Sequence, residues 1–198
     1  MLSKRKERMI QLTVGIIVLI ILYALKNTNY FVRVSTFVFS VFLFYFADRF
    51  FNLRFKKSHY IAFLLVSTAG ILLSPLYFIS PNYDKILHIA SPILIGFLVY
   101  YLADRAKISF PIKLLITFSV VVSSLALFEI IEYIIDQFFD FKLQGVFLRD
   151  ISGVAKLNII MDRNDDTMID LILGTIGSAI FIGYKSIEYK IQSLKKKK

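Results

Sequence analysis

Acidic residues and a histidine recur at helical spacing inside otherwise apolar stretches of this sequence. Asp84 and His88 are four residues apart, so a helix would place them on one face, with Ser91 one turn further along. Glu129 and Glu132 are three residues apart and would share a face of a second helix. This spacing predicts that ionisable side chains line particular helix faces.

A third apolar stretch repeats the pattern. Asp166 and Asp170 are four residues apart and continue into Gly174 and Gly177, small residues along which membrane helices approach closely. We therefore expect these two aspartates to face protein and not lipid. Asp136 extends the face of the two glutamates by a further turn.

Clustered ionisable groups at membrane depth indicate a cavity, a ligand site or an ion path, because each costs at least about 2.5–3.5 kcal/mol at a helix centre on insertion scales. The alternative is a purely structural hydrogen-bond network between helices. The candidate site residues are Asp84, His88, Glu129, Glu132, Asp166 and Asp170.

So many carboxylates need a counter-charge, and three sources stay open: a divalent cation, shared protons, or a basic residue (Lys85, Arg149 or Arg163) folding over. One imidazole among carboxylates suits Mg²⁺, Mn²⁺, Ca²⁺ or iron better than a structural zinc. Pro92 removes the helical donor for the carbonyl of His88, which would offer another oxygen ligand. The candidate metal ligands are His88, Glu129, Glu132, Asp166 and Asp170, with Asp84 in the same layer.

The elements that must position these groups are membrane helices. The 198 residues are 57% hydrophobic with 20 Phe, and a transmembrane helix needs about 20 predominantly apolar residues. We predict an all-α bundle forming a single transmembrane domain over residues 1–198, with an outer loop at 136–165. The six expected helices cover approximately 9–25, 31–47, 60–79, 84–103, 112–135 and 166–184.

The distribution of basic residues predicts the orientation of the bundle. Seventeen of the 24 Lys and Arg fall in alternate segments on one side, which the positive-inside rule places in the cytoplasm together with both termini. We therefore expect a multi-pass protein of the cytoplasmic membrane whose candidate site lies at the outer ends of its helices. The net charge of +10 is thus explained by topology, and no nucleic-acid partner is expected.

Several kinds of chemistry are excluded by composition and motif. The absence of cysteine excludes disulfides, thiolate zinc sites and cysteine nucleophiles. No Gly-rich phosphate loop, Ser-His-Asp arrangement or HExxH motif occurs. A local echo, Tyr-Phe-Ala-Asp-Arg at 45–49 and Tyr-Leu-Ala-Asp-Arg at 101–105, leaves open whether the chain contains a duplication.

Three motifs occur in order over residues 80–184: Tyr83-Asp84-Lys85-x-x-His88, Phe128-Glu129-x-x-Glu132-Tyr133, and Asp166-Thr167-x-x-Asp170-x-x-x-Gly174-x-x-Gly177. They resemble the YjdF-like family of membrane proteins of unknown function and, more distantly, the VanZ-like family. The resemblance implies that the six candidate residues are family signature positions, and it brings no reaction. The VanZ-like pattern differs at Glu132 and at Asp165-Asp166, so antibiotic resistance is not implied for this chain.

The hypothesis that follows is an outward-facing Asp/His/Glu pocket that binds or processes a lipid or lipid-linked envelope component, with a divalent metal as its candidate cofactor. Membrane lipids are the expected partners. The alternatives are a small cation- or proton-coupled transporter and a non-catalytic membrane scaffold. Whether the protein is an enzyme stays open, as do its substrate and its oligomeric state.

Overall fold

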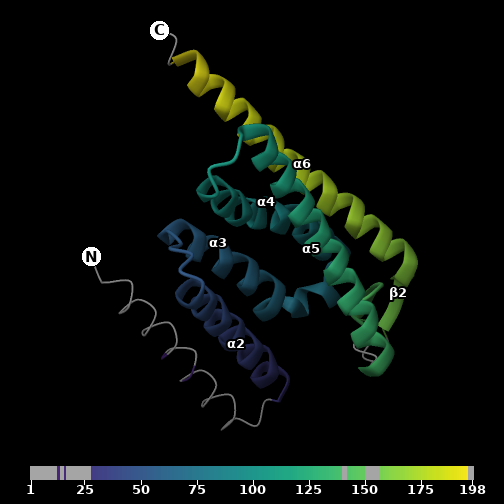
Figure 1. Ribbon diagram of the computed structural model, residues 1–198. Helices are drawn as coiled ribbons and strands as arrows, with labels where there is room; N and C mark the ends of the chain where they lie inside the picture. Colours follow the sequence, from purple (N-terminus) through teal and green to yellow (C-terminus); the bar gives the residue numbers. More distant parts are fainter. Residues whose placement is uncertain (1–12, 14–15, 17–27, 140–141, 150–156, 196–198) are drawn as a thin grey trace. The chain divides into compact units, whose positions relative to one another are not determined.

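The computed structural model describes residues 28–139, 142–149 and 157–195, together with Thr13 and Ile16. The expected helix at 9–25 and the terminal Lys196–Lys198 run lie outside the described residues. The chain divides into two compact units, Met1–Ser74 and Pro75–Lys198, and each is described by itself. Figure 1 shows the helices and strands in sequence colours.

Four described helices are long and apolar enough to cross a membrane. They lie over the segments expected at 31–47, 84–103, 112–135 and 166–184, and each helix extends beyond the expected limits. The protein is therefore a membrane protein with several apolar helices, while six spans with both termini inside stay predictions. The four helices are α2 (Thr28–Phe50), α4 (Pro81–Arg105), α5 (Phe110–Phe139) and α6 (Arg163–Lys195).

The segment expected as one helix over 60–79 is divided into shorter pieces. An α-helix, α3 (Lys57–Ser67), continues into a π-helical turn, η1 (Thr68–Leu72), and a 3-10 helix, η2 (Ser74–Phe78), follows. Pro75 has no N–H to donate to the carbonyl of residue 71, so the helix cannot continue through this point, which agrees with the break between η1 and η2. A uniform apolar pattern does not reveal such a break.

The first unit contains a buried polar turn between α2 and α3, which we call the Asp48 turn (residues 48–60). The carboxylate of Asp48 accepts the N–H of Phe55 at 3.0 Å and the hydroxyl of Tyr60. His59 is 2% exposed, and its Nδ1 accepts the N–H of Lys56 at 2.9 Å. Both oxygens of this buried carboxylate therefore have donors.

In the second unit α4, α5 and α6 pack against one another, and glycines allow the close approach (Figure 1). A Cβ built on Gly177 would lie 2.3 Å from the carbonyl oxygen of Ile89, so α6 touches the backbone of α4 there. A Cβ on Gly174 would lie 2.5 Å from Leu125 of α5. The glycine face that we expected to pack against protein does so, which places Asp166 and Asp170, on the same helix, inside the unit.

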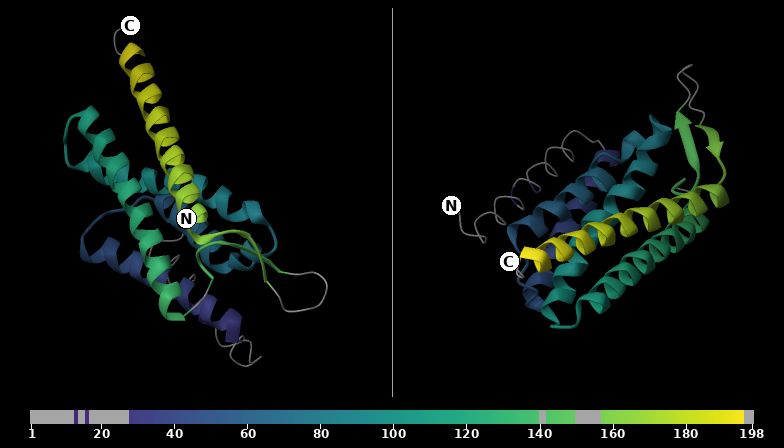
Figure 2. Two further views of the ribbon diagram at one scale, coloured as in Figure 1. Left: turned by 90° about the vertical axis from the view of Figure 1, so that its right-hand side faces the viewer. Right: turned by 90° about the horizontal axis from the view of Figure 1, so that it is seen from above.

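A two-stranded antiparallel hairpin connects α5 to α6, within a region that we expected to be loop. Its strands are β1 (Val146–Arg149) and β2 (Leu157–Met161), and Phe147 pairs with Ile159. Figure 2 shows the hairpin at the end of the unit where α6 begins. The connection is also shorter than the expected 136–165, because α5 continues to Phe139 and α6 begins at Arg163.

Candidate acid–histidine site

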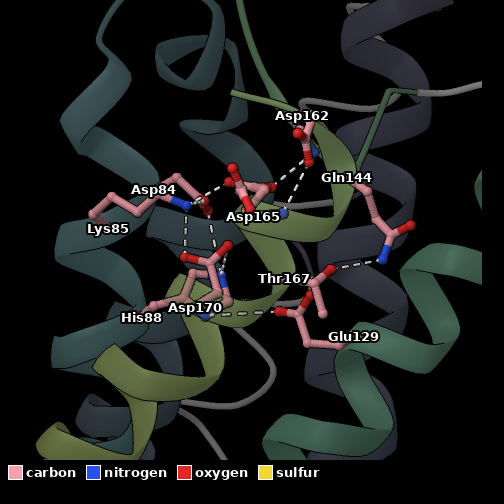
Figure 3. Close-up of polar contacts among 11 residues, drawn as sticks. Asp84, Lys85, His88, Glu129, Gln144, Asp162, Asp165, Thr167 and Asp170 are labelled. Atoms are coloured by element: carbon pink, nitrogen blue, oxygen red, sulfur yellow. Dashed lines mark hydrogen bonds and ion pairs between the residues drawn. The ribbon is translucent and has the colours of Figure 1, made fainter. Parts of the chain in front are cut away.

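Residues from three helices meet at one end of the second unit, near the start of α4 and of α6 (Figure 3). Each helix contributes one or more charged or titratable side chains, and the helical spacing predicted from the sequence brings them to a common point. We call this group the acid–histidine cluster; it consists of Asp84, Lys85 and His88 from α4, Glu129 from α5, and Asp166 and Asp170 from α6.

Lys85 is the cation at the centre of the cluster. Its Nζ contacts Oδ1 of Asp166, Oδ1 of Asp170 at 2.8 Å and Oδ2 of Asp84 at 3.3 Å. Of the three counter-charge sources that the sequence left open, the structure thus shows a folded-over lysine. Its position beside Asp84, near the start of α4, was a usable signal, since a cation near a helix N-terminus is unfavourable with the helix dipole and is stabilised by carboxylate partners.

His88 lies between the carboxylates of all three helices. Its Nε2 is 3.4 Å from Oδ1 of Asp84 and 3.7 Å from Oδ2 of Asp170, and its Nδ1 is 3.9 Å from Oε1 of Glu129. Each aspartate therefore directs one oxygen to Lys85 and the other to His88. The two ring nitrogens face different carboxylates, which gives the imidazole a defined orientation.

Glu129 differs from the aspartates in its environment. Its side chain is 5% exposed, and Oε1 has no hydrogen-bond partner, the one such buried side-chain atom found in the described part of the chain. A buried oxygen without a donor is unfavourable by about 1–3 kcal/mol. This atom points towards Nδ1 of His88, so a small movement would supply the missing donor.

Asp166 connects the cluster to the start of the hairpin. Its Oδ2 accepts the N–H of Gly145 at 2.7 Å while Oδ1 pairs with Lys85. Next to it, the side-chain amide of Gln144 donates to the hydroxyl of Thr167 at 2.8 Å. Sequence reasoning missed these loop contacts, because residues 20 or more positions apart meet only after the connection has folded.

Two carboxylates that the sequence placed on the glutamate face have other surroundings. Asp136 is buried and accepts the N–H groups of Leu143 and Gln144 at 3.0 and 2.9 Å, so it anchors the loop. Glu132 is half-buried and makes no hydrogen bond or ion pair with the described residues. The candidate site therefore consists of the residues of the cluster, and Glu132 is not one of them.

A tyrosine hydroxyl from η2 also lies near these carboxylates. Tyr77 lies close enough to Asp84 and Glu132 for their negative charges to act on its hydroxyl. Its ring packs edge-to-face on Tyr83, with 5.1 Å between the centroids. Tyr77 thus stays protonated and offers an O–H donor beside the acidic groups.

The chemistry available here is that of cation binding. Four carboxylates face one ammonium group and one imidazole, so negative charge is in excess when His88 is neutral. One ligand atom each from Asp84, His88 and Asp170 lies within 4.8 Å of the others, close enough to share an ion. Of the six predicted site residues the structure joins five, and it shows no such shared set for Glu129, Glu132 and Asp166 among the described residues.

Comparison with known proteins gives a family and no function. Residues 7–189 match the family described as "Predicted membrane protein (DUF2238)". The chain belongs to this family, in agreement with its apolar helices, whereas the match does not extend to the YjdF-like or VanZ-like names. No curated protein and no solved structure matches the chain.

Proposed function

We propose that the protein binds the headgroup of a lipid or lipid-linked molecule at the acid–histidine cluster. The observation that carries this proposal is an excess of buried negative charge at one end of three apolar, membrane-length helices. Charged groups are retained at such positions when they have partners or ligands, because burying them alone is costly.

The exposure of the cluster is graded, which supports binding from one side. The side chains of Asp84 and Lys85 are 19% and 16% exposed, while that of Asp170 is 3% exposed. A ligand would therefore meet α4 first. The Lys85 ammonium can bind a phosphate oxygen, and the carboxylates can bind a headgroup amine or a cation that accompanies the phosphate.

The positive-inside distribution adds the side of the membrane to the proposal. With both termini in the cytoplasm, the start of α4 and of α6 would lie at the outer face of the cytoplasmic membrane. Lipids of the outer leaflet and lipid-linked envelope components would reach the cluster there. The resemblance of the three motifs to the YjdF-like and VanZ-like families is compatible with a membrane-surface role and assigns no reaction.

The hydroxyl groups deeper in the second unit favour headgroup binding over cation transport. The hydroxyls of Thr117, Ser124 and Thr175 donate to carbonyls of their own helices at 2.7, 2.8 and 2.7 Å. The protons of these three hydroxyls are engaged within their own helices and do not link one helix to another. A pathway would need polar groups linked across its length.

Native mass spectrometry of the detergent-purified full chain tests the proposal. We expect selective retention of phospholipids by headgroup when phosphatidylethanolamine, phosphatidylglycerol and phosphatidylcholine with identical acyl chains are offered together. Asp170→Asn and Asp170→Leu should reduce the selectivity at least 10-fold. Lys85 would keep Asp84 and Asp166 as partners in both variants, so both are expected to fold.

Asp104→Asn is the matched control, because Asp104 is 57% exposed and pairs with Lys113 away from the cluster. It should leave headgroup selectivity unchanged. Retention that is indifferent to the headgroup, or selectivity that survives both Asp170 variants, would contradict the proposal and favour the non-catalytic scaffold.

A further inference from the structure

The two aspartates of the cluster that flank His88 each direct one oxygen to Lys85 and the other to His88. Oδ2 of Asp84 and Oδ1 of Asp170 face the Lys85 ammonium at 3.3 and 2.8 Å. Oδ1 of Asp84 and Oδ2 of Asp170 face Nε2 of His88 at 3.4 and 3.7 Å. Lys85 can therefore stay paired while the second oxygen of each aspartate binds something else.

We propose that Oδ1 of Asp84, Oδ2 of Asp170 and Nε2 of His88 bind one divalent cation of the Mn²⁺ or Mg²⁺ kind, and that Glu129 positions His88. This deepens the proposed function, on which it rests, by naming the cation that would bridge the carboxylates to a headgroup phosphate. Two carboxylates and one imidazole are ligands that manganese, magnesium and iron accept.

The separations suit such an ion after small side-chain rotations. Adjacent ligands of an octahedral cation with bonds of about 2.1 Å are about 3 Å apart. The observed separations of 3.4 and 3.7 Å from Nε2 exceed that value by less than 1 Å. One ligand atom from each of the three residues lies within 4.8 Å of the others, and all three residues belong to the helices α4 and α6.

Glu129 supplies the independent observation. Its Oε1 is buried without a donor and lies 3.9 Å from Nδ1, the ring nitrogen opposite the proposed metal ligand. A histidine that binds a metal through one nitrogen usually donates the other N–H to a carboxylate or carbonyl, which fixes its tautomer. Metal binding at Nε2 would place the proton on Nδ1 and give Oε1 of Glu129 the donor it lacks.

This assignment differs from the ligand set expected from the sequence. Glu129 becomes a positioning residue, and Asp166 is excluded as a ligand because its two oxygens are engaged by Lys85 and by the N–H of Gly145. Asp84 enters the set. The two ligand sets differ because the structure shows which partner each carboxylate oxygen contacts. Residue spacing alone does not contain that information.

The chain has two histidines, so nitrogen NMR of the full-length protein labelled with ¹⁵N-histidine gives a direct test. Adding MnCl₂ in lipid-free detergent should broaden the ring resonances of His88, as a direct ligand, at one equivalent and far more strongly than those of His59. Equal sensitivity of the two rings, or none at 100 equivalents, would overturn the metal site.

Three variants test the metal ligand, the positioning residue and a control position. Asp170→Asn should weaken Mn²⁺ binding at least 10-fold, and Glu129→Gln should weaken it 10- to 100-fold while shifting the tautomer signature of His88. Asp104→Asn should change neither. Unaltered His59 resonances would verify the fold of the first unit, and unaltered hydrogen exchange in α5 that of the second. Binding that survives Glu129→Gln with the tautomer unchanged would refute the positioning role.

This metal titration contains no lipid, so it fails independently of the headgroup proposal. If Mn²⁺ has no effect on His88 while headgroup selectivity is intact, the metal site is overturned and the lipid-binding proposal stands. If Mn²⁺ binds while lipid retention shows no headgroup selectivity, the cation site stands and the lipid-binding proposal is overturned.

Discussion

The protein places its two histidines in two buried polar regions that are built differently. In the Asp48 turn, both oxygens of the aspartate accept donors from the same turn, and Nδ1 of His59 accepts a backbone N–H. In the acid–histidine cluster, carboxylates exceed the available cations and one buried oxygen has no donor. A buried aspartate beside a buried histidine is therefore not enough to indicate a binding site. The acid–histidine cluster is the candidate because its carboxylates exceed its cations and one buried oxygen has no donor.

The two copies of the Tyr-x-Ala-Asp-Arg sequence also differ in how their aspartates are paired. Asp48 of the first copy is 7% exposed and holds the α2–α3 turn, in which Asn52 and Arg54 adopt left-handed backbone conformations. Asp104 of the second copy is 57% exposed and pairs with Lys113 at 2.6 Å. Two local sequences that differ at one position thus give a structural aspartate in one place and a surface ion pair in the other.

The largest expected difference between the two regions is their side of the membrane. In this cysteine-free chain, Ser58→Cys in the Asp48 turn should be shielded from an impermeant thiol reagent in intact cells. Asn82→Cys, beside the cluster, should react. Both positions are exposed in the structure, so the reagent can reach them wherever water does. Labelling of Ser58→Cys alone would reverse the predicted orientation.

Removal of the structural aspartate should have the largest effect on stability. Asp48→Ala leaves the Phe55 N–H and the Tyr60 hydroxyl without an acceptor, and each buried donor left alone costs about 1–3 kcal/mol. We expect the free energy of unfolding in detergent to fall by about 3 kcal/mol. Asp104→Asn should change it by less than about 0.5 kcal/mol. Equal losses would show that burial is irrelevant at these positions.

Neutralising one carboxylate of the cluster should raise the free energy of unfolding, in contrast to the loss expected for Asp48→Ala. Glu129→Gln removes a buried charge whose Oε1 has no donor, so with EDTA present it should stabilise the protein by up to about 1 kcal/mol. Chemical unfolding monitored by circular dichroism measures the change. A loss of 2 kcal/mol or more would mean that Glu129 serves the fold in the way Asp48 does.

The smallest expected effect is a dependence on pH in the Asp48 turn. Burial lowers the pKa of His59 from its ordinary value of 6.5, and the nearby Lys56 ammonium lowers it further. The unfolded chain therefore binds a proton at a higher pH than the folded one, and stability falls as pH drops below about 6.5. Hydrogen exchange of α3 amides should show this loss, and His59→Gln should abolish it.

The sequence predicted most of the second unit because its signals are local. Asp84 with His88, and Asp166 with Asp170, share helix faces through spacing alone, and Gly174 with Gly177 indicated the packing face. Lys85 was expected only as one of several alternative counter-charges, because the sequence alone does not show which basic residue reaches the carboxylates. The loop contact of Asp166 is made with the N–H of Gly145, whose positive φ of 91° belongs to a turn that no spacing rule anticipated.

The first unit was less predictable for a related reason. The apolar run from Tyr60 to Ile79 has the composition of one helix, yet it contains the π-helical turn at Thr68–Leu72 and the break before Pro75. Proline marks where regular helix ends, but the i to i+5 bond from the Leu73 N–H to the Thr68 carbonyl, at 3.0 Å, has no counterpart in the hydrophobic pattern.

The central claim is that one of the two buried histidine regions binds a headgroup and the other does not. Its most direct test follows both histidine rings of the ¹⁵N-histidine-labelled full chain while dihexanoyl phosphatidylethanolamine, phosphatidylglycerol or phosphatidylcholine is added below its micelle concentration. We predict saturable, headgroup-selective shifts of His88 with His59 unchanged, and loss of those shifts in Asp170→Asn. Shifts of His59 equal to those of His88, or a His88 ring that ignores all three lipids with and without Mg²⁺, would contradict it.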